Sequence, residues 1–330
     1  MTTLPSPASC DDTADARRIG IILNPLSGRV RRNPGRFSEL VSRIPAASIV
    51  QTSNPSEMGT ALAAWALADN DVLVVIGGDG TLQAALTWLY RQQPEHIPQI
   101  MPIAAGTTNM SARAIGLRDN PLTTLEALVA WLEHSGPAPS CLPRPVLQVM
   151  DTSTLTLQCG MFFGAGAIVT GVRYFHSRVK PAGVKGIAGP ALAFLRMLLA
   201  LSTRTSGPLL QRVKARIDIG PVQREAPWLL LLATTLDKLM LGSKPFWGAE
   251  RAAMHFTAIA TPSSRLWYAL PWVLRGRPTS AMRRDPDYLS HNANSVNIEH
   301  LQEYLLDGEI FEVSGKLQLG ISADVRFIGL

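Results

Sequence analysis

The sequence predicts two domains: an α/β N-terminal domain with a mostly parallel sheet, and a β-rich C-terminal domain. Three observations lead to this prediction. Strand and helix patterns alternate up to about residue 135, and the unbroken apolar run at 72–76 is typical of a parallel strand covered on both faces. Beyond residue 138, strand-like segments follow one another without regular helices. With 330 residues, the chain is long enough for two hydrophobic cores.

In the first domain, strands are expected near Ile19, Ile49, Val72 and Ile100, with helices between and after them. The expected helices cover 37–43, 58–67, 82–92, 109–115 and 122–133. The Gly-Pro-Ala-Pro-Ser stretch at 136–140 is rich in turn formers and predicts the boundary, so the domains are 18–137 and 138–330. Residues 1–17 are polar and acidic, which predicts a disordered tail and not a signal peptide.

The second domain contains several strand patterns and two apolar segments of a different kind. Strands are expected at 146–150, 155–163, 213–219, 228–234, 255–259, 296–298 and 310–313. The apolar stretch at 190–201 is interrupted by Arg196 and is too short to span a bilayer, which favours a core helix. The segment 265–277 is aromatic and flanked by arginines, which favours an interfacial segment over a core helix with solvated ends.

Charge and cysteine content narrow the functional classes. The formal net charge is +6 and the pI about 9.5, which suits an anionic membrane surface or a polyphosphate ligand. No helix-turn-helix, zinc pattern or basic stripe with interleaved aromatic residues is present, so no nucleic-acid partner is expected. Cys10, Cys141 and Cys159 are odd in number and have no Cys-x-x-Cys spacing, which argues against a disulfide framework and suits a reducing cytoplasm.

A glycine-rich turn at 77–81 (Gly-Gly-Asp-Gly-Thr) directly follows the apolar strand at 72–76. Its three glycines remove the Cβ atoms that would hold a ligand away from the backbone, and successive N–H groups at a helix N-terminus bind phosphate oxygens. Asp79 adds a carboxylate, which implies a metal ion or a reacting proton nearby. The alternative is a turn whose glycines serve only tight backbone geometry.

Two further strands end in similar turns. The strand at 19–23 leads into Asn-Pro-Leu-Ser-Gly-Arg at 24–29, and the strand at 99–104 leads into the small and polar residues at 105–113. In an open α/β sheet these turns lie together at the carboxyl ends of the strands, where ligands bind. Three such turns in the first 113 residues are hard to explain by packing alone.

Four motifs in order carry a family resemblance. They are Asn-Pro-x-Ser-Gly-Arg at 24–29, Gly-Gly-Asp-Gly-Thr at 77–81, Pro-x-x-x-Gly-Thr-x-Asn at 102–109 and Asp-Gly-Glu at 307–309. With them the chain resembles the diacylglycerol kinase catalytic-domain family, which includes bacterial lipid kinases and the sphingosine and ceramide kinases. The resemblance spans about 19–328 and is strong only at these motifs. It implies a sandwich-like second domain and an ATP-dependent lipid kinase of phospholipid metabolism.

The resemblance also implies roles for individual residues. Glu309 is the expected proton acceptor from the lipid hydroxyl, and Asp79 the second catalytic residue, near a Mg²⁺ ion bound through the nucleotide. ATP is the expected phosphoryl donor. The expected nucleotide-binding residues are Asn24, Ser27, Arg29, Thr52, Gly77, Gly78, Asp79, Gly80, Thr81, Thr107 and Asn109. The expected partner is a lipid at the inner face of the membrane, contacted peripherally by a cytoplasmic protein, and a homodimer is compatible with these features.

The chain departs from the family pattern in two places, and alternatives remain open. Met110 stands where most bacterial members carry Asp, which points away from a simple diacylglycerol kinase. The segment 243–255 lacks the Asp-Gly that supports a structural Mg²⁺ site in many relatives, so that site is expected to be absent. Asp-Gly at 307–308 is also a common hairpin turn.

Two other functions compete with the lipid kinase. An NAD kinase shares Gly-Gly-Asp-Gly, but no Asn-Glu pair follows that motif here. A non-catalytic lipid or nucleotide binder is disfavoured because both Asp79 and Glu309 are present.

Overall fold

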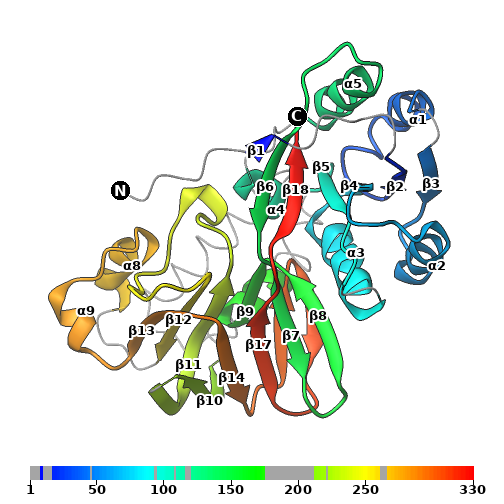
Figure 1. Ribbon diagram of the computed structural model, residues 1–330. Helices are drawn as coiled ribbons and strands as arrows, with labels where there is room; N and C mark the ends of the chain where they lie inside the picture. Colours follow the sequence, from blue (N-terminus) through cyan, green and yellow to red (C-terminus); the bar gives the residue numbers. More distant parts are fainter. Residues whose placement is uncertain are drawn as a thin grey trace. The chain divides into compact units, whose positions relative to one another are not determined.

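The computed structural model describes residues 8–9, 17–44, 47–92, 95–107, 109–115, 120–174, 212–220, 222–260 and 266–330 (Figure 1). The chain forms two compact units, one of Met1–Arg144 with Ala323–Leu330 and the other of Pro145–Ser322. The sequence placed the boundary at 137/138 and did not return the C-terminus to the first unit. The difference arises because β6 (Ser140–Arg144) is a strand of the first sheet, where it pairs with the last strand of the chain, β18 (Val325–Gly329).

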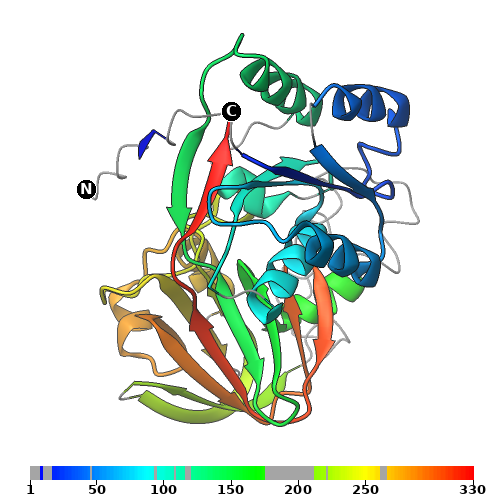
Figure 2. The same cartoon turned by 45° about the vertical axis from the view of Figure 1, so that its right-hand side comes forward.

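The first unit contains a seven-stranded sheet in the order β1-β6-β18-β5-β4-β2-β3. The strands not yet bounded are β1 (Ala8–Ser9), β2 (Ile19–Leu23), β3 (Ala47–Gln51), β4 (Val72–Gly77) and β5 (Gln99–Ala104). Strands β3, β2, β4, β5 and β18 run parallel, whereas β6 pairs antiparallel with β18 and β1 pairs antiparallel with β6. Figure 2 shows β18 beside β6. The predicted mostly parallel α/β sheet is confirmed.

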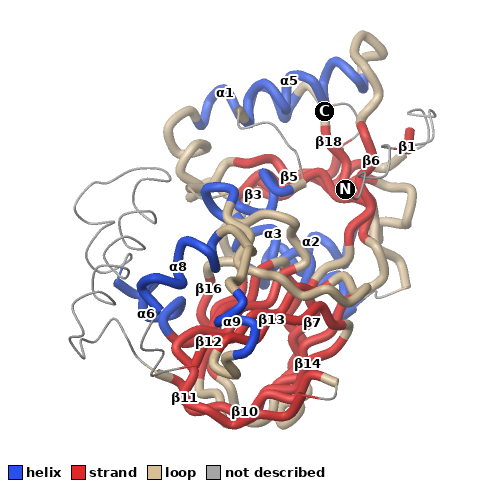
Figure 3. Tube along the Cα trace, turned by 90° about the vertical axis from the view of Figure 1, so that its left-hand side faces the viewer, coloured by secondary structure: helices blue, strands red, loops and turns tan. Residues whose placement is uncertain are grey.

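Helices cover both faces of this sheet, which explains why every residue of β4 is buried. On one face, α1 (Pro34–Ser42) packs with α5 (Pro121–Leu132) over inward-facing strand residues such as Ile21 and Val74. On the other, α2 (Pro55–Trp65) and α3 (Asp79–Gln92) lie together, as Figure 3 shows. A short helix, α4 (Met110–Ala114), follows β5. All five predicted helices are present, with ends shifted by a few residues.

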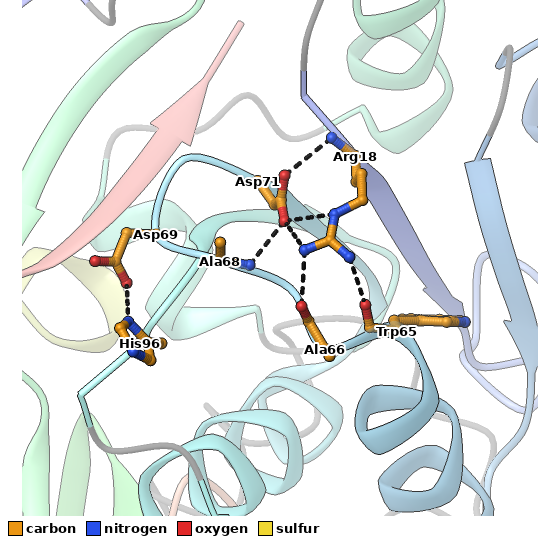
Figure 4. A network of polar contacts seen from close by, with 7 residues as sticks. All are labelled: Arg18, Trp65, Ala66, Ala68, Asp69, Asp71 and His96. Atoms are coloured by element: carbon orange, nitrogen blue, oxygen red, sulfur yellow. Dashed lines mark hydrogen bonds and ion pairs between the residues drawn. The ribbon is translucent and has the colours of Figure 1, made fainter.

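A polar network fastens the starting ends of β2 and β4, the edge opposite the glycine-rich turn (Figure 4). The Asp71 carboxylate accepts the backbone N–H of Arg18 at 3.0 Å and that of Ala68 at 2.7 Å, and it pairs with the Arg18 guanidinium at 2.7 Å. Burial alone would raise the pKa of Asp71, but these donors together hold it below its ordinary value. The guanidinium also donates to the carbonyl oxygens of Trp65 and Ala66 at the end of α2. This network therefore has a structural role, because it ties two strands to a helix end.

The second unit contains one 11-stranded sheet whose pairings are antiparallel, with a large core packed on it. Its strands are β7 (Leu147–Asp151), β8 (Thr156–Gly160), β9 (Phe162–Gly166), β10 (Val213–Ile219), β11 (Val222–Thr234), β12 (Met254–Ala260), β13 (Tyr288–Ala293), β14 (Ser295–Glu299), β15 (Glu303–Leu306), β16 (Glu309–Glu312) and β17 (Leu317–Ile321). The buried Trp228 anchors the core and donates its indole N–H to the Ala215 carbonyl at 2.9 Å. The predicted β-rich second domain is confirmed.

Several details of the second unit differ from the prediction. The expected strand at 155–163 is two strands, because the chain turns at Met161. The helices α6 (Ala167–Tyr174), α8 (Leu266–Leu274) and α9 (Ser280–Arg284) and the short 3₁₀ turn η4 (Met240–Gly242) complete the unit. The apolar segment 190–201 lies outside the described residues. Within the described part, no helix is long and apolar enough to cross a bilayer.

Candidate functional site

The order of the parallel strands creates a switch point in the first unit. From β2 the chain moves to β3 on one side, and it later crosses to β4 on the other side of β2. Loops leaving the carboxyl ends of β2 and β4 therefore diverge, and in open α/β sheets ligands bind in the crevice that this divergence opens. The turn at 24–29 follows β2, and the turn at 77–81 follows β4. Two of the predicted motifs thus flank the switch point.

Hydrogen bonds connect the three predicted turns. The Asn24 amide group donates to the Thr81 hydroxyl at 2.9 Å, and the Asn24 backbone N–H donates to the Ile76 carbonyl at 2.9 Å. The third turn is joined to the first, because the N–H of Arg29 donates to the Ala105 carbonyl at 3.0 Å. The side chain of Asn24 therefore positions the start of α3.

Two glycines allow the second and third turns to lie backbone against backbone. The N–H groups of Ala105 and Gly106 both donate to the Gly77 carbonyl, at 2.9 and 3.0 Å. A Cβ built on Gly106 would lie only 2.5 Å from the Cα of Gly78 and 2.8 Å from Oδ1 of Asn109. Gly106 was quoted within its motif but was not predicted as a site residue. Its contact with Gly78 could not be read from the sequence because the two residues are far apart in the chain.

The glycine-rich turn presents backbone donors at the start of α3. In the described part of the chain, the N–H groups of Gly78, Asp79 and Gly80 have no acceptor, whereas those of Thr81 and Leu82 donate to the Gly78 carbonyl. A small open cleft here is lined by Gly77, Gly78, Asp79, Leu82, Ile103, Ala104, Asn109 and Ala112. The positive end of a 14-residue helix is therefore open to a ligand.

Asp79 makes contacts that differ from those expected. Its Oδ1 accepts the N–H of Ser111 at 2.9 Å and its Oδ2 accepts that of Met110 at 3.0 Å, so the carboxylate caps α4. Burial raises the pKa of Asp79, although the N–H groups of Ser111 and Met110 act in the opposite direction. Because each oxygen accepts an N–H group of α4, the geometry fits a positioning role, and a role of Asp79 near a nucleotide-bound Mg²⁺ stays a prediction. Among the described residues, no group of three or more His, Cys, Asp or Glu side chains could hold a metal ion.

The side chain of Asn109 holds the third turn through hydrogen bonds to its backbone. Asn109 is buried, adopts a left-handed backbone conformation (φ 49°) and precedes α4. Its Oδ1 accepts the Gly106 N–H at 2.8 Å, and its amide group donates to the Gly106 carbonyl at 3.0 Å. Thr107, in contrast, is exposed and lies near Gly28 of the first turn, so it is available to a ligand.

Two other predicted nucleotide contacts are engaged within the protein. The buried Thr52 hydroxyl donates to the Glu57 carboxylate at 2.5 Å and accepts the Asn54 N–H at 2.9 Å, so it stabilises the β3–α2 connection. Ser27 is buried, and its N–H donates to the Asn24 carbonyl at 3.1 Å. The structure therefore brings Ser27 to the turn beside the cleft and holds Thr52 in local contacts.

In the second unit, Asp307 and Gly308 form the two-residue turn of the β15–β16 hairpin. Leu306 pairs with Glu309, and both turn residues have positive φ (48° and 98°), as a type I′ turn requires. The buried Asp307 carboxylate accepts the N–H groups of Met161 and Phe162 at 2.8 and 2.9 Å, which fixes the hairpin to β9. Glu309 is exposed at the first position of β16. The geometry of the turn thus accounts for Asp and Gly at 307 and 308, and the Glu309 carboxylate remains accessible.

The segment that lacks the relatives' Asp-Gly is fastened to β13 by Glu250. The Glu250 carboxylate accepts the Asn292 N–H at 2.8 Å and contacts Nδ1 of His291 at 2.7 Å. Burial opposes the ionised form, but the Asn292 N–H and the His291 ring outweigh it and lower the pKa of Glu250 to about 2. An acidic residue in this segment therefore organises a loop against a strand.

Comparisons with known proteins agree with this architecture. A solved structure described as a diacylglycerol kinase from Bacillus anthracis str. Sterne has a TM-score of 0.61 and 16% identity, covering 95% of this chain and 96% of that chain. A second structure from that organism gives 0.62 and 15% identity over 93% of this chain and 94% of that chain. At such identities the likeness concerns the fold. A sequence comparison with curated proteins finds no match.

The family comparison concerns the first unit. Residues 18–135 match the family model of the diacylglycerol kinase catalytic domain, and three of the four motifs lie inside this range. The fourth, at 307–309, lies outside it. The match confirms, for residues 18–135, the resemblance to the diacylglycerol kinase catalytic-domain family seen in the sequence.

Proposed function

We propose that this protein is an ATP-dependent lipid kinase, which transfers the γ-phosphate of ATP to the hydroxyl of a diacylglycerol, sphingoid or related lipid. One observation carries the proposal. The N–H groups of Gly78, Asp79 and Gly80 lack acceptors in the described chain, and they lie at the start of α3, at the switch point of a parallel sheet. Such donors bind phosphate oxygens, because they offer hydrogen bonds and the positive end of a helix dipole together.

The surrounding side chains have two proposed roles. Asn24, Asp79 and Asn109 hold the three turns in register through hydrogen bonds within the protein. The exposed Thr107 and the turn containing Ser27 and Arg29 are the proposed contacts to the nucleotide. In phosphoryl transfer, positioning and charge stabilisation provide most of the catalysis, so a rigid arrangement of donors is what the chemistry requires. A divalent cation would arrive with the nucleotide and neutralise phosphate charge.

The lipid hydroxyl needs a proton acceptor before it can attack phosphorus. We propose Glu309 for this role, because its carboxylate is exposed while the turn before it is fixed by Asp307. The proposed location of the reaction is the cytoplasmic face of a membrane, where such lipids reside.

A direct assay tests the proposal. The protein is incubated with ATP labelled in the γ-phosphate, Mg²⁺ and separate acceptors: diacylglycerol, sphingosine, ceramide, polyprenol and NAD. Label in one lipid supports the proposed kinase and identifies its acceptor. Label in NAD alone, which the shared Gly-Gly-Asp-Gly motif makes worth testing, would replace it with an NAD kinase. ATP binding measured by calorimetry without transfer to any acceptor would indicate the non-catalytic binder.

A further inference from the structure

Helix α8 exposes an apolar face while its opposite face is buried. Ala269 and Val273, four positions apart, pack into a small core with residues of α6, β11, β12, α9 and β13. Tyr268 and Trp272, also four apart, lie one above the other on the helix surface. Their side chains are 79% and 47% exposed. An exposed aromatic pair of this size is typical of an interaction surface.

A neighbouring loop adds a third apolar side chain. The N–H of Lys244 donates to the Leu274 carbonyl at 2.9 Å, so the loop 239–244 ends against the C-terminus of α8. In this loop Leu241 is 72% exposed and has a left-handed backbone (φ 58°), which is disfavoured for a branched residue. The fold thus holds a large apolar side chain in solvent despite local strain.

Cations accompany these side chains. Lys244, Arg275 and Arg277 are exposed, and no carboxylate in the described chain pairs with any of them. The Arg275 guanidinium donates to the Pro271 carbonyl at 3.1 Å, and the N–H of Arg277 donates to the Trp272 carbonyl at 2.9 Å. These contacts keep both arginines at the aromatic end of α8. We call the six residues Tyr268, Trp272, Leu241, Lys244, Arg275 and Arg277 the α8 ridge.

We propose that the α8 ridge docks the protein on an anionic lipid bilayer. Aromatic rings favour the headgroup region, an apolar side chain favours the acyl boundary, and lysine and arginine favour anionic headgroups. A second copy of the chain fits less well, because a twofold contact would bring the cations of both copies together. The proposal rests on the proposed lipid kinase only in that such an enzyme must reach a membrane-bound acceptor.

The structure changes which residues carry the interfacial reading of 265–277. Arg265 and the side chain of Trp267 lie outside what the structure describes. Tyr268 and Leu241 take their place as anchors, and Leu241 belongs to a different segment of the chain. Leu241 and Trp272 are therefore the apolar residues whose substitution tests the ridge.

The test measures sedimentation of the full chain with vesicles, without ATP. Phosphatidylcholine vesicles containing phosphatidylglycerol should bind the protein more tightly than pure phosphatidylcholine, and salt should weaken the binding. Leu241→Ser and Trp272→Ala should each weaken it about tenfold. Arg275→Gln or Arg277→Gln should each weaken it about fivefold. Leu155→Ser is the matched control, because Leu155 is 79% exposed with φ 52° but lies in the β7–β8 turn, away from these cations in sequence.

Two outcomes would overturn the proposal. One is equal vesicle binding by the Leu241→Ser and Leu155→Ser proteins. The other is absence of vesicle binding, which would assign the ridge to a contact between copies if sedimentation equilibrium showed a dimer that Leu241→Ser dissociates. Failure of docking is distinct from failure of the kinase, because phosphorylation can be measured on lipid in detergent micelles. Vesicle binding without phosphorylation of any lipid would reject the kinase alone.

Discussion

Replacing Gly106 with Ala tests whether the glycine-rich turn works as a phosphate site. The substitution adds one methyl group at the point where the second and third turns touch. In the structure that Cβ would lie 2.5 Å from the Cα of Gly78 and 2.8 Å from Oδ1 of Asn109. The Cα of Gly78 is a backbone atom that cannot rotate away as the end of a side chain can, so the backbone itself must move.

The size of the effect follows from these distances. Ordinary contact to a Cβ begins at about 3.4 Å, so the two turns must separate by roughly 1 Å to accept the methyl group. Overpacking of this kind typically costs about 1–3 kcal/mol of unfolding free energy. A shift of about 1 Å in groups that position a substrate can cost about 10²-fold in rate. Because the N–H of Gly78 is among the proposed phosphate donors, ATP affinity should fall together with turnover.

Gly35→Ala is the control, because Gly35 is exposed near the start of α1, outside the three turns. A Cβ there would have no neighbour within 4 Å. Urea denaturation, calorimetric ATP binding and steady-state kinetics are measured on both variants. We expect Gly35→Ala to remain within a few-fold of the parent protein while Gly106→Ala loses ATP binding and turnover. If Gly106→Ala is folded and binds ATP as the Gly35→Ala protein does, the nucleotide does not use this turn.

Three further predictions concern carboxylates. Asp79→Asn leaves one N–H group of α4 without an acceptor. This should lower the unfolding free energy measured in urea by about 1–3 kcal/mol, less the gain from removing a buried charge, and displacement of the turns should reduce turnover. Unchanged stability and turnover would contradict the positioning role. Glu309→Gln should lower kcat by about 10² to 10⁴ with ATP affinity within a few-fold, whereas Glu312→Gln on the same exposed strand should not. The pKa of Glu250 is about 2 instead of 4.5, so its contribution to stability is present above the unfolded pKa and is lost as the pH falls through about 2. Glu250→Gln should remove this acid dependence when urea denaturation is measured as a function of pH.

The central strands of the first unit could be predicted because local pattern determines them. The run that forms β4 is apolar without interruption since helices cover both faces of the sheet, and its glycine turn follows directly. Strands such as β13 (Tyr288–Ala293) were missed because polar residues such as Ser290, His291 and Asn292 obscure the pattern. Their side chains find partners distant in sequence: the His291 ring contacts the Glu250 carboxylate, and the Asn292 amide group donates to the Glu250 carbonyl.

The candidate site was predictable in its backbone and less so in its side chains. The sequence identified the three turns, and the strand order brings them together. It gave no sign that Asp79 turns toward α4 or that Thr52 is engaged by Glu57, because side-chain direction depends on the neighbouring turn. The exposure of Leu241 was equally hidden, since a single leucine beside a glycine is unremarkable in a sequence.

The return of the last strand to the first sheet has a consequence for how this protein is made. During synthesis, the ribosome releases residues 18–135 long before β18, which lies between β5 and β6. Until the C-terminus emerges, the edge of β5 has no partner on that side, and unpaired parallel edges invite wrong pairing. A nascent chain truncated before residue 323 would therefore carry every phosphate-binding motif on an unfinished sheet, exposed to proteolysis and aggregation. The second unit is an insertion in the first, and it must be synthesised before β18 can complete the first sheet.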